Sequence, residues 1–209
     1  MTYQTILFDF DGTLVDTEKS VLTSLQIVLA RHGIHKTFAE LEFSLGIPGL
    51  NAMKQLGVTD PVAVGREWSA EALLHKKSVT IFPGITKLIQ QLKQTGHQIG
   101  IVTSKNEAEV RDEIAIYPFT KQMAIIVSAS DTKLHKPKPD PLLYTIQQLN
   151  SDAVNTLYIG DTEYDLKAAL GAGTGFAVAG WGAHDHGQFK QATYYLQQPQ
   201  QLLTQLTLN

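Results

Sequence analysis

Four apolar runs of the sequence are each followed by side chains that are able to take part in polar chemistry. These side chains are carboxylates, hydroxyls and one lysine, namely Asp9 with Asp11, Thr103 with Ser104, Lys136, and Asp161 with Asp165. Each run is short and ends at a turn signal, which is typical of a fully buried strand. Because the carboxyl ends of parallel strands open onto one crevice, these distant residues are expected to share one site.

The carboxylates of this predicted site indicate a metal ion. Asp9 with Asp11 and Asp161 with Asp165 would bring several negative charges together. Two unit charges 4 Å apart repel by roughly 4 kcal/mol at an effective dielectric of 20, so such a cluster needs cations. Oxygen ligands without a neighbouring His or Cys favour Mg²⁺, which takes one or two carboxylates and keeps waters and substrate phosphate as further ligands. Lys136 would add a fixed positive charge.

A carboxylate beside a magnesium ion is able to attack a phosphate group. We expect Asp9 to be the nucleophile, because carboxylates form aspartyl-phosphate intermediates and the metal neutralises charge on both reactants. Asp11 would protonate the leaving-group oxygen and then activate water. The phosphoryl oxygens would be bound by hydroxyls, backbone amides and an ammonium, those of Gly12, Thr13, Thr103, Ser104 and Lys136. Thr103 and Lys136 are therefore also expected to be catalytic.

The elements that position these residues follow from the alternation of apolar runs and helical patterns. The predicted strands lie at residues 5–10, 98–103, 124–128, 156–160 and 175–178. The predicted helices lie at residues 85–96, 140–149 and 162–173, and the glutamine-rich tail at 191–205 is expected to end in a terminal helix. Asp140 would be the N-cap of the second of these helices. This alternation predicts an α/β fold with a doubly wound parallel sheet covered on both faces.

Residues 16–81 interrupt this alternation with helical patterns and no convincing strand. They are predicted to form a helical cap, inserted into an α/β core made of residues 1–15 and 82–209. Such an insert would lie over the carboxyl ends of the strands, where open parallel sheets bind their ligands. Substrate selectivity is therefore expected from cap residues near the site, namely Asp16, Thr17, Gly46, Ile47 and Asn51.

Composition excludes several classes of function. The net charge of −3 and the lack of any Lys/Arg-rich block argue against nucleic-acid binding. The chain has no cysteine, which rules out disulfides, thiolate zinc sites and cysteine nucleophiles. No run approaches the ~20 apolar residues that span a bilayer, and the first residues lack the basic region of a signal peptide. We therefore expect a soluble cytoplasmic protein. The predicted cap over the site implies that its substrate is a small phosphorylated metabolite.

The four groups of polar residues resemble the four sequence motifs of the haloacid dehalogenase superfamily, in order and over the whole chain. The matching segments are Asp9-x-Asp11-Gly12-Thr13, Thr103-Ser104, Lys136-Pro137-Lys138-Pro139 and Gly160-Asp161-x-x-x-Asp165. The predicted insert resembles the small helical cap of that superfamily. The resemblance implies that Mg²⁺ is bound by the carboxylates of Asp9 and Asp161 and by the backbone carbonyl of Asp11. It further implies that Lys136 is the catalytic lysine, and that Asp165 holds a metal-bound water or orients Lys136.

Within the superfamily, residues 11–17 and 102–105 most resemble phosphoglycolate phosphatases and the related pyrophosphatases. Asp11 argues against a dehalogenase, because that branch lacks an acid/base aspartate at this position. The resemblance makes 2-phosphoglycolate the first candidate substrate, with pyrophosphate, a nucleoside monophosphate or a sugar phosphate as alternatives. A phosphosugar mutase and a binding protein without activity are rival classes, although the complete set of Asp9, Asp11, Lys136 and Asp161 argues against the latter. His135 replaces a glycine common in relatives, which leaves the geometry of its loop open.

Two patterns have a plain structural alternative. His184-x-His186 has the spacing of a metal-binding pair, but its glycine-containing surroundings favour a solvated loop. Asp165 lies four residues after Asp161, so it could equally be exposed helix surface or a first-turn aspartate favoured by the helix dipole.

Overall fold

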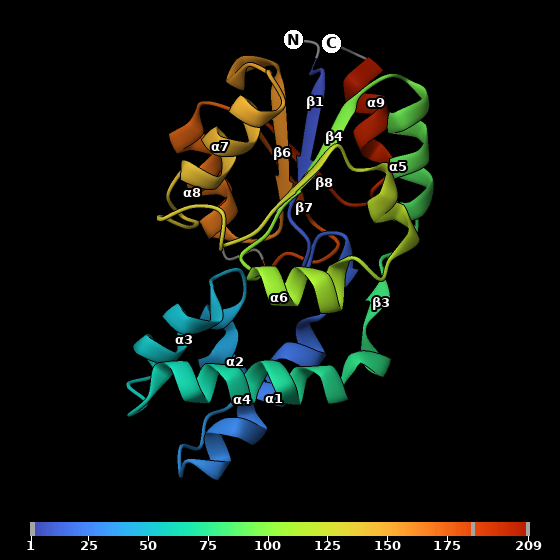
Figure 1. The fold of residues 1–209 in the computed structure, drawn as a ribbon. Coiled ribbons are helices and arrows are strands. Elements are labelled where there is room, and N and C mark those ends of the chain that lie inside the picture. The colour runs from blue at the N-terminus through green and yellow to red at the C-terminus, as the bar shows by residue number, and fades with distance from the viewer. Residues whose placement is uncertain (1–2, 185–186, 208–209) are drawn as a thin grey trace.

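A six-stranded parallel sheet lies at the centre of the larger part of the molecule (Figure 1). The computed structural model describes residues 3–184 and 187–207. In spatial order the strands are β5 (Ile125–Val127), β4 (Gln98–Val102), β1 (Thr5–Phe8), β6 (Thr156–Gly160), β7 (Gly175–Ala179) and β8 (Tyr194–Leu196). Every neighbouring pair runs parallel. The chain winds outward from β1 in both directions, which confirms the doubly wound α/β fold.

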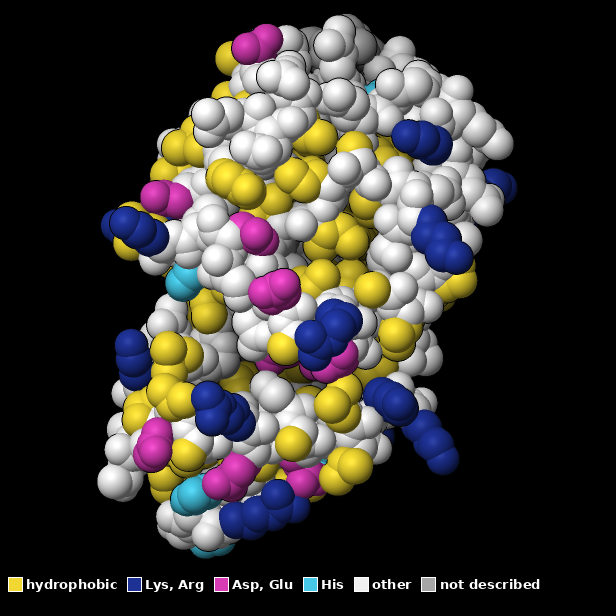
Figure 2. Space-filling model, in the orientation of Figure 1, with side chains coloured by type: hydrophobic (Ala, Val, Ile, Leu, Met, Phe, Trp, Pro, Cys, Tyr) yellow, Lys and Arg dark blue, Asp and Glu magenta, His cyan; other side chains and the backbone are white. Residues whose placement is uncertain are grey.

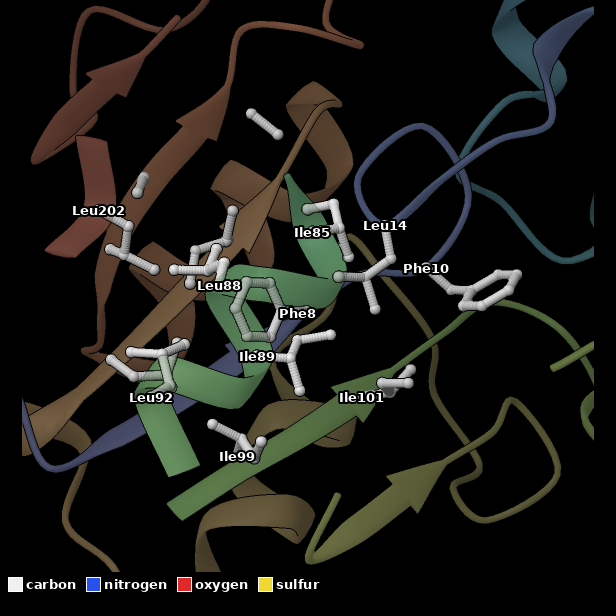
Figure 3. Close-up of a cluster of buried hydrophobic side chains, with 14 of the residues drawn as sticks. Phe8, Phe10, Leu14, Ile85, Leu88, Ile89, Leu92, Ile99, Ile101 and Leu202 are labelled. Atoms are coloured by element: carbon white, nitrogen blue, oxygen red, sulfur yellow. The ribbon is translucent and has the colours of Figure 1, made fainter. Parts of the chain in front are cut away.

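Helices cover both faces of this sheet (Figure 1). They are α5 (Ile85–Gln94) and α9 (Gln201–Thr207) on one face, and α7 (Asp140–Gln148) and α8 (Glu163–Ala172) on the other. Alternate side chains of a strand point to opposite faces, so Ile6 and Phe8 of β1 pack in the cluster that includes α5, whereas Leu7 packs with α7 and α8. Figure 3 shows the leucines and isoleucines of α5 lying against Phe8. Burial on both faces explains why β1 is an uninterrupted apolar run.

The core helices begin and end near the expected residues, with one exception. Thr162 caps α8, because its hydroxyl accepts from the Asp165 amide while the Asp165 carboxylate accepts from the Thr162 amide. Gly173 ends the same helix with a φ of 74°, in the left-handed region that favours glycine. Asp140 was expected to cap α7, but it is the first helical residue. Pro139 occupies the N-cap without a side-chain hydrogen bond.

The segment between β2 and β3 is helical and packs around a hydrophobic cluster of its own. Its helices are α1 (Glu18–Arg31), α2 (Phe38–Leu41), α3 (Gly49–Gln55) and α4 (Pro61–Leu74), with short turns η1 (Glu42–Ser44) and η2 (Lys76–Ser78). Leu22 and Leu25 of α1 pack in this cluster with Met53 of α3 and Trp68 of α4. Figure 1 shows these helices gathered beyond the carboxyl ends of the sheet strands. We call them the cap helices.

Three short strands were not expected from the sequence. β2 (Val15–Asp16) and β3 (Thr80–Ile81) pair antiparallel where the chain enters and leaves the cap helices. Two residues are too few to show an alternating pattern, so the expectation that residues 16–81 hold no strand was wrong at both ends of that segment. β8 adds a strand at the sheet edge within the tail, from which only the helix α9 was foreseen.

The remaining elements connect the sheet to its helices. They are α6 (Glu107–Glu109), η3 (Val110–Ile114), η4 (Pro118–Gln122) and η5 (Ala153–Asn155). On the face drawn in Figure 2, Lys and Arg side chains are scattered among acidic ones and form no continuous block. Within the described ranges, none of the helices combines the length and the apolar character needed to cross a lipid bilayer.

Candidate active site

The predicted site residues come together at the carboxyl ends of the central strands. Asp9 directly follows β1, and its amide donates to the Ile159 carbonyl at 2.8 Å, which extends the pairing with β6. Thr103 follows β4, and its amide donates to Val127 of β5 at 2.9 Å. Asp161 follows β6. The backbone pairing of the sheet therefore fixes where these side chains start, at the point where the strand order changes direction.

Lys136 reaches this point from the loop after β5 and is fully enclosed there. Its Nζ donates to Oδ1 of Asp9 at 2.8 Å, to Oδ1 of Asp165 at 2.7 Å and to the hydroxyl of Tyr158 at 3.1 Å. Only 1% of the lysine side chain is exposed. An ammonium has three N–H donors, and each of them has a partner here. Burial alone would lower the pKa of Lys136, but the two carboxylates raise it above its usual value, so the ammonium stays charged.

Tyr158 completes this network and was not foreseen from the sequence. It lies in β6 and is fully buried, with its hydroxyl 2.8 Å from Oδ1 of Asp165 and 3.2 Å from the Val102 carbonyl. Burial raises the pKa of Tyr158 well above its usual value, so the hydroxyl is neutral and keeps its proton. The available signal was a tyrosine in an otherwise aliphatic buried strand, because a buried tyrosine hydroxyl needs a partner.

Asp165 is completely buried, which rules out the exposed helix surface considered above. Its Oδ1 accepts from Lys136 and Tyr158, and its Oδ2 accepts from the amide and hydroxyl of Thr162. Both oxygens are therefore occupied by protein donors. Of the two roles that the resemblance implied, this pattern matches the orientation of Lys136.

Asp9 and Asp161 are the carboxylates best placed to bind a metal. Oxygens of Asp9, Asp161 and Asp165 lie within 4.8 Å of one another. Oδ1 of Asp9 is bound by Lys136 and Oδ1 of Asp161 by the Thr13 hydroxyl at 3.0 Å, while no hydrogen bond from the described residues reaches Oδ2 of either. Burial raises the pKa of Asp9 to about 7, and burial with the nearby carboxylates raises that of Asp161 well above its usual value. A nearby cation would favour the ionised form of both buried carboxyls. Because their ligand atoms are oxygens, Mg²⁺ fits this place.

The loop after Asp9 must approach Asp161 closely. Gly12 has a φ of 74°, and a Cβ at this position would overlap the Asp161 carboxylate. The Gly12 amide donates to the Val15 carbonyl at 2.9 Å, so it is not available to a phosphate in this arrangement. The Thr13 hydroxyl is likewise committed to Asp161, whereas the Thr13 amide makes no hydrogen bond to the described residues. Of these predicted phosphate contacts, the Thr13 amide remains open.

The hydroxyls after β4 are partly engaged by the protein. The Thr103 hydroxyl accepts from the Lys105 amide at 3.2 Å, which leaves its proton available. Ser104 donates instead to the Gly46 carbonyl, at 2.7 Å, and so links the core to the cap helices. The hydroxyl proton of Ser104, which lines the same cavity as Asp9, is therefore not available to a phosphate in this arrangement.

Asp11 points into the cavity beside Lys105. Oδ1 of Asp11 is buried and accepts no hydrogen bond from the residues that the structure describes. Nζ of Lys105 lies 3.4 Å from this atom, an ion-pair distance, and donates to Glu113 at 2.8 Å. An unsatisfied buried carboxylate oxygen at a cavity wall is suited to exchange a proton with a bound ligand.

The cavity lies between the core and the cap helices and encloses about 90 Å³. Of the cap residues predicted to set selectivity, Thr17, Gly46 and Ile47 line it. Asp16 is exposed and pairs with Thr80 in β2, and Asn51 lies in α3 without lining the cavity. Glu18, which lies in the segment 16–20 expected to hold selectivity residues, also lines it, and lining residues that the sequence did not reveal include Trp68, Ser69, Lys105, Glu109 and Glu113. Their helices were mostly visible in the sequence, but which helix face meets the core was not.

His184 and His186 were singled out by their spacing, but a metal site formed by both is not seen among the described residues. Nε2 of His184 lies 2.8 Å from the Glu18 carboxylate at the start of α1, a second link between core and cap. The hydrogen bond to Glu18 raises the pKa of His184, which favours an ion pair there. His186 lies outside the described residues. Nδ1 of His135 is buried and has no hydrogen-bond partner among the described residues.

Comparison with known proteins gives consistent matches over the core and the helical insert. The sequence profile of the family described as haloacid dehalogenase-like hydrolase matches residues 6–179. A phosphoglycolate phosphatase of Xanthomonas campestris is 30% identical over 208 residues, covering 94% of this chain and 93% of that protein. Pyrophosphatase PpaX of Bacillus velezensis is 30% identical over 184 residues, covering 84% and 82%.

A solved structure adds evidence from the fold. The crystal structure of a protein from Lactobacillus plantarum, provisionally named as a phosphoglycolate phosphatase, superimposes with a TM-score of 0.90 at 32% identity. The match covers 98% of this chain and 99% of that one. Both the sheet and the cap helices of this chain thus have counterparts in a known structure.

Proposed function

This chain belongs to the haloacid dehalogenase-like hydrolase family and is a phosphatase, and we propose that it hydrolyses a small phosphorylated metabolite with Mg²⁺. The first candidate substrate is 2-phosphoglycolate. Asp9 is the proposed nucleophile and Asp11 the acid and base. The observation that carries this proposal is the placement of Asp9 against the buried ammonium of Lys136, next to Asp161. We keep the cytoplasm as the expected compartment, on the sequence grounds given above.

In the first step a bond forms between a carboxylate oxygen of Asp9 and the phosphorus, and the bond from phosphorus to the leaving-group oxygen breaks. Asp11, protonated, gives its proton to that oxygen, so the leaving group departs as an alcohol. Asp9 and Asp161 are the residues that would hold Mg²⁺, which would supply the charge neutralisation that lets one anion attack another. Lys136 holds Asp9 in place through a hydrogen bond, and Asp165 and Tyr158 orient the Lys136 ammonium for it.

In the second step Asp11 acts in the opposite sense. Its carboxylate takes a proton from a water molecule, whose oxygen attacks the phosphorus of the aspartyl-phosphate. The bond between phosphorus and Asp9 breaks, inorganic phosphate leaves and the Asp9 carboxylate is regenerated. The free Oδ1 of Asp11 is the atom that would carry this proton in both steps.

Cavity size supports a small leaving group. Pockets for drug-sized ligands usually measure about 300–1,000 Å³, so a cavity of about 90 Å³ favours a leaving group such as glycolate over a nucleoside. Pyrophosphate is the second candidate, because relatives of similar identity carry the name of a pyrophosphatase. A nucleoside monophosphate or a sugar phosphate is larger, so its binding would require the cap helices to move away from the core. This holds for a phosphatase and for a mutase alike.

The direct test is phosphate release from a panel of these candidate substrates, each with Mg²⁺ and with a chelator. We expect release that depends on Mg²⁺ and is fastest with 2-phosphoglycolate. Absence of release from every substrate with Mg²⁺ present would overturn the proposal. Conversion of a sugar phosphate to its isomer faster than its hydrolysis would instead identify a mutase, and binding without turnover would identify a protein without activity.

A further inference from the structure

Lys105 contributes the one Lys or Arg side chain among the described residues that line the catalytic cavity, and the mechanism above does not use it. It follows Ser104 in the loop after β4, with 14% of its side chain exposed. Because it lies in the same cavity as Asp9 and Asp11, its charge acts on whatever occupies that space.

The distance between Lys105 and Asp11 places the lysine ammonium near the bond that breaks. Asp11 must lie within hydrogen-bond distance of the leaving-group oxygen in order to give it a proton. Nζ of Lys105 lies 3.4 Å from Oδ1 of Asp11. A charged group placed two or three bonds beyond the leaving-group oxygen therefore comes next to this ammonium. The carboxylate of glycolate and the second phosphate of pyrophosphate are both groups of this kind.

Lys105 also has donors left, in contrast to Lys136. An ammonium carries three N–H groups. Lys105 uses one for Glu113 at 2.8 Å, and its contact with Asp11 is an ion pair without a hydrogen bond. Lys136 uses all three within the protein. Of the two lysines at the site, Lys105 is thus the one able to bind a group of the substrate without giving up a partner.

Apart from Lys105, every charged side chain among the described residues that line the cavity is acidic. Glu18, Glu109 and Glu113 all line it. The Glu109 carboxylate accepts from the Ser69 hydroxyl and the Asn106 amide, and these two hydrogen bonds hold it in place. An anionic leaving group would be repelled by such a wall unless one cation received it. An uncharged leaving group has no such requirement.

We propose that Lys105 binds the anionic group of the leaving group and thereby selects substrates such as 2-phosphoglycolate and pyrophosphate over esters with an uncharged leaving group. This inference rests on the proposed function and names its substrate class. Lys105 acts here as a specificity residue, since it contacts the part of the substrate that departs and not the phosphoryl group.

The test compares two esters of nearly the same shape, 2-phosphoglycolate and 2-hydroxyethyl phosphate, which differ in the carboxylate. We would measure kcat and KM of both with the unmodified chain, Lys105→Met and Lys105→Arg. Glu113 loses its partner in Lys105→Met, so the double variant Lys105→Met with Glu113→Gln is included to avoid a partly buried carboxylate without a partner. Exposed Lys121, which lies outside the cavity, provides the matched control Lys121→Met.

We expect the double variant to lose about 10- to 100-fold in kcat/KM for 2-phosphoglycolate, chiefly through KM, which is the range for one hydrogen bond to a charged group. The change with 2-hydroxyethyl phosphate should stay within about 3-fold. Lys105→Arg should retain most of the preference, and Lys121→Met should match the unmodified chain. Equal losses on both esters in the double variant would overturn the inference, because Lys105 would then act only through Asp11 or the fold.

The same data separate this inference from the proposed function. If the unmodified chain hydrolyses both esters equally well, a phosphatase remains but selection of an anionic leaving group is wrong. If it hydrolyses neither ester nor pyrophosphate with Mg²⁺ present, the proposed function fails and the inference fails with it.

Discussion

The floor and the roof of the cavity are built in different ways. On the floor, Asp9, Lys136, Asp165 and Tyr158 are all buried, and they bind one another through hydrogen bonds of 2.7–3.1 Å. Toward the roof, core and cap helices are joined by isolated contacts between partly exposed groups, such as those from Ser104 to Gly46 and from His184 to Glu18. The proposed reacting groups are thus held by an interlocked network, whereas the proposed selectivity residues lie where core and cap helices are joined by contacts that can break one at a time.

Replacing Asp9 by Asn should have the largest effect. The variant keeps the size of the side chain but removes the nucleophile, so we expect kcat to fall by at least about 10⁴-fold. The fold should survive, because the change removes one of several buried carboxylates that repel each other. Phosphate release and thermal unfolding followed by circular dichroism would check both points. Substantial turnover in a folded variant would exclude Asp9 as the nucleophile.

Replacing Tyr158 by Phe tests whether the floor network is interlocked. The change removes one partner of Lys136 and one donor to Asp165 in a fully buried place. We expect a loss of about 1–3 kcal/mol in the free energy of unfolding and a fall of about 10-fold in kcat with little change in KM. Phe176, which packs beside Tyr158 without touching Lys136, gives a matched control as Phe176→Leu. If only stability falls, as in the control, Tyr158 does not position Lys136.

Removing Mg²⁺ should affect stability in a pH-dependent way. In the metal-free protein the pKa of Asp9 is raised to about 7, so between about pH 4 and pH 7 the folded state holds a proton that the unfolded chain has lost. Stability of the metal-free protein should therefore fall as pH rises through this window. Mg²⁺ competes with that proton, so it should raise the melting temperature more at pH 8 than at pH 5. An equal rise at both values would argue against binding by Asp9 and Asp161.

Replacing Ser104 by Ala should have the smallest effect and tests the roof. The change breaks the hydrogen bond from Ser104 to the Gly46 carbonyl but leaves the floor intact. We expect KM to change by less than about 5-fold, kcat to stay similar and stability to fall by no more than about 1 kcal/mol. Ser69→Ala, which breaks the contact with Glu109, should behave alike. A large fall in kcat would mean that Ser104 binds the phosphoryl group, as first expected from the sequence.

The floor and the roof of the cavity also differ in how far the sequence could predict them. The strand ends that carry Asp9, Thr103 and Asp161 were predictable, because short apolar runs indicate buried strands and parallel strands share one edge. The site residues Lys136 and Asp165 could be named, and their contact was one of the two roles that the resemblance implied for Asp165. The sequence could not choose between the two roles, since the contact depends on the path of a long loop. Tyr158 was missed because a buried strand residue gives no sign of what its hydroxyl meets.

The roof was less predictable for a physical reason. Helical spacing identified the cap helices, and Gly46 and Ile47 do line the cavity. Asn51 and Asp16 do not line the cavity. Which face of an element lies toward the core depends on tertiary packing, and the spacing of residues in the sequence does not reveal it. Lys105 stood beside a recognised motif but was not singled out, since a lysine in a loop is usually exposed. The two-residue strands β2 and β3 were too short to show any periodicity.

The most direct test of the central claim is to trap the phosphoryl group on Asp9. Asp11→Asn should lack the base that activates water, while p-nitrophenyl phosphate releases a leaving group that needs no proton from the protein. After mixing with this substrate and Mg²⁺ and quenching in acid, mass spectrometry should find one added phosphoryl group, located at Asp9 by peptide mapping. The double variant Asp9→Asn with Asp11→Asn should show none. Turnover of the substrate with no added mass, or a phosphoryl group on another residue, would contradict the assignment of Asp9 as nucleophile.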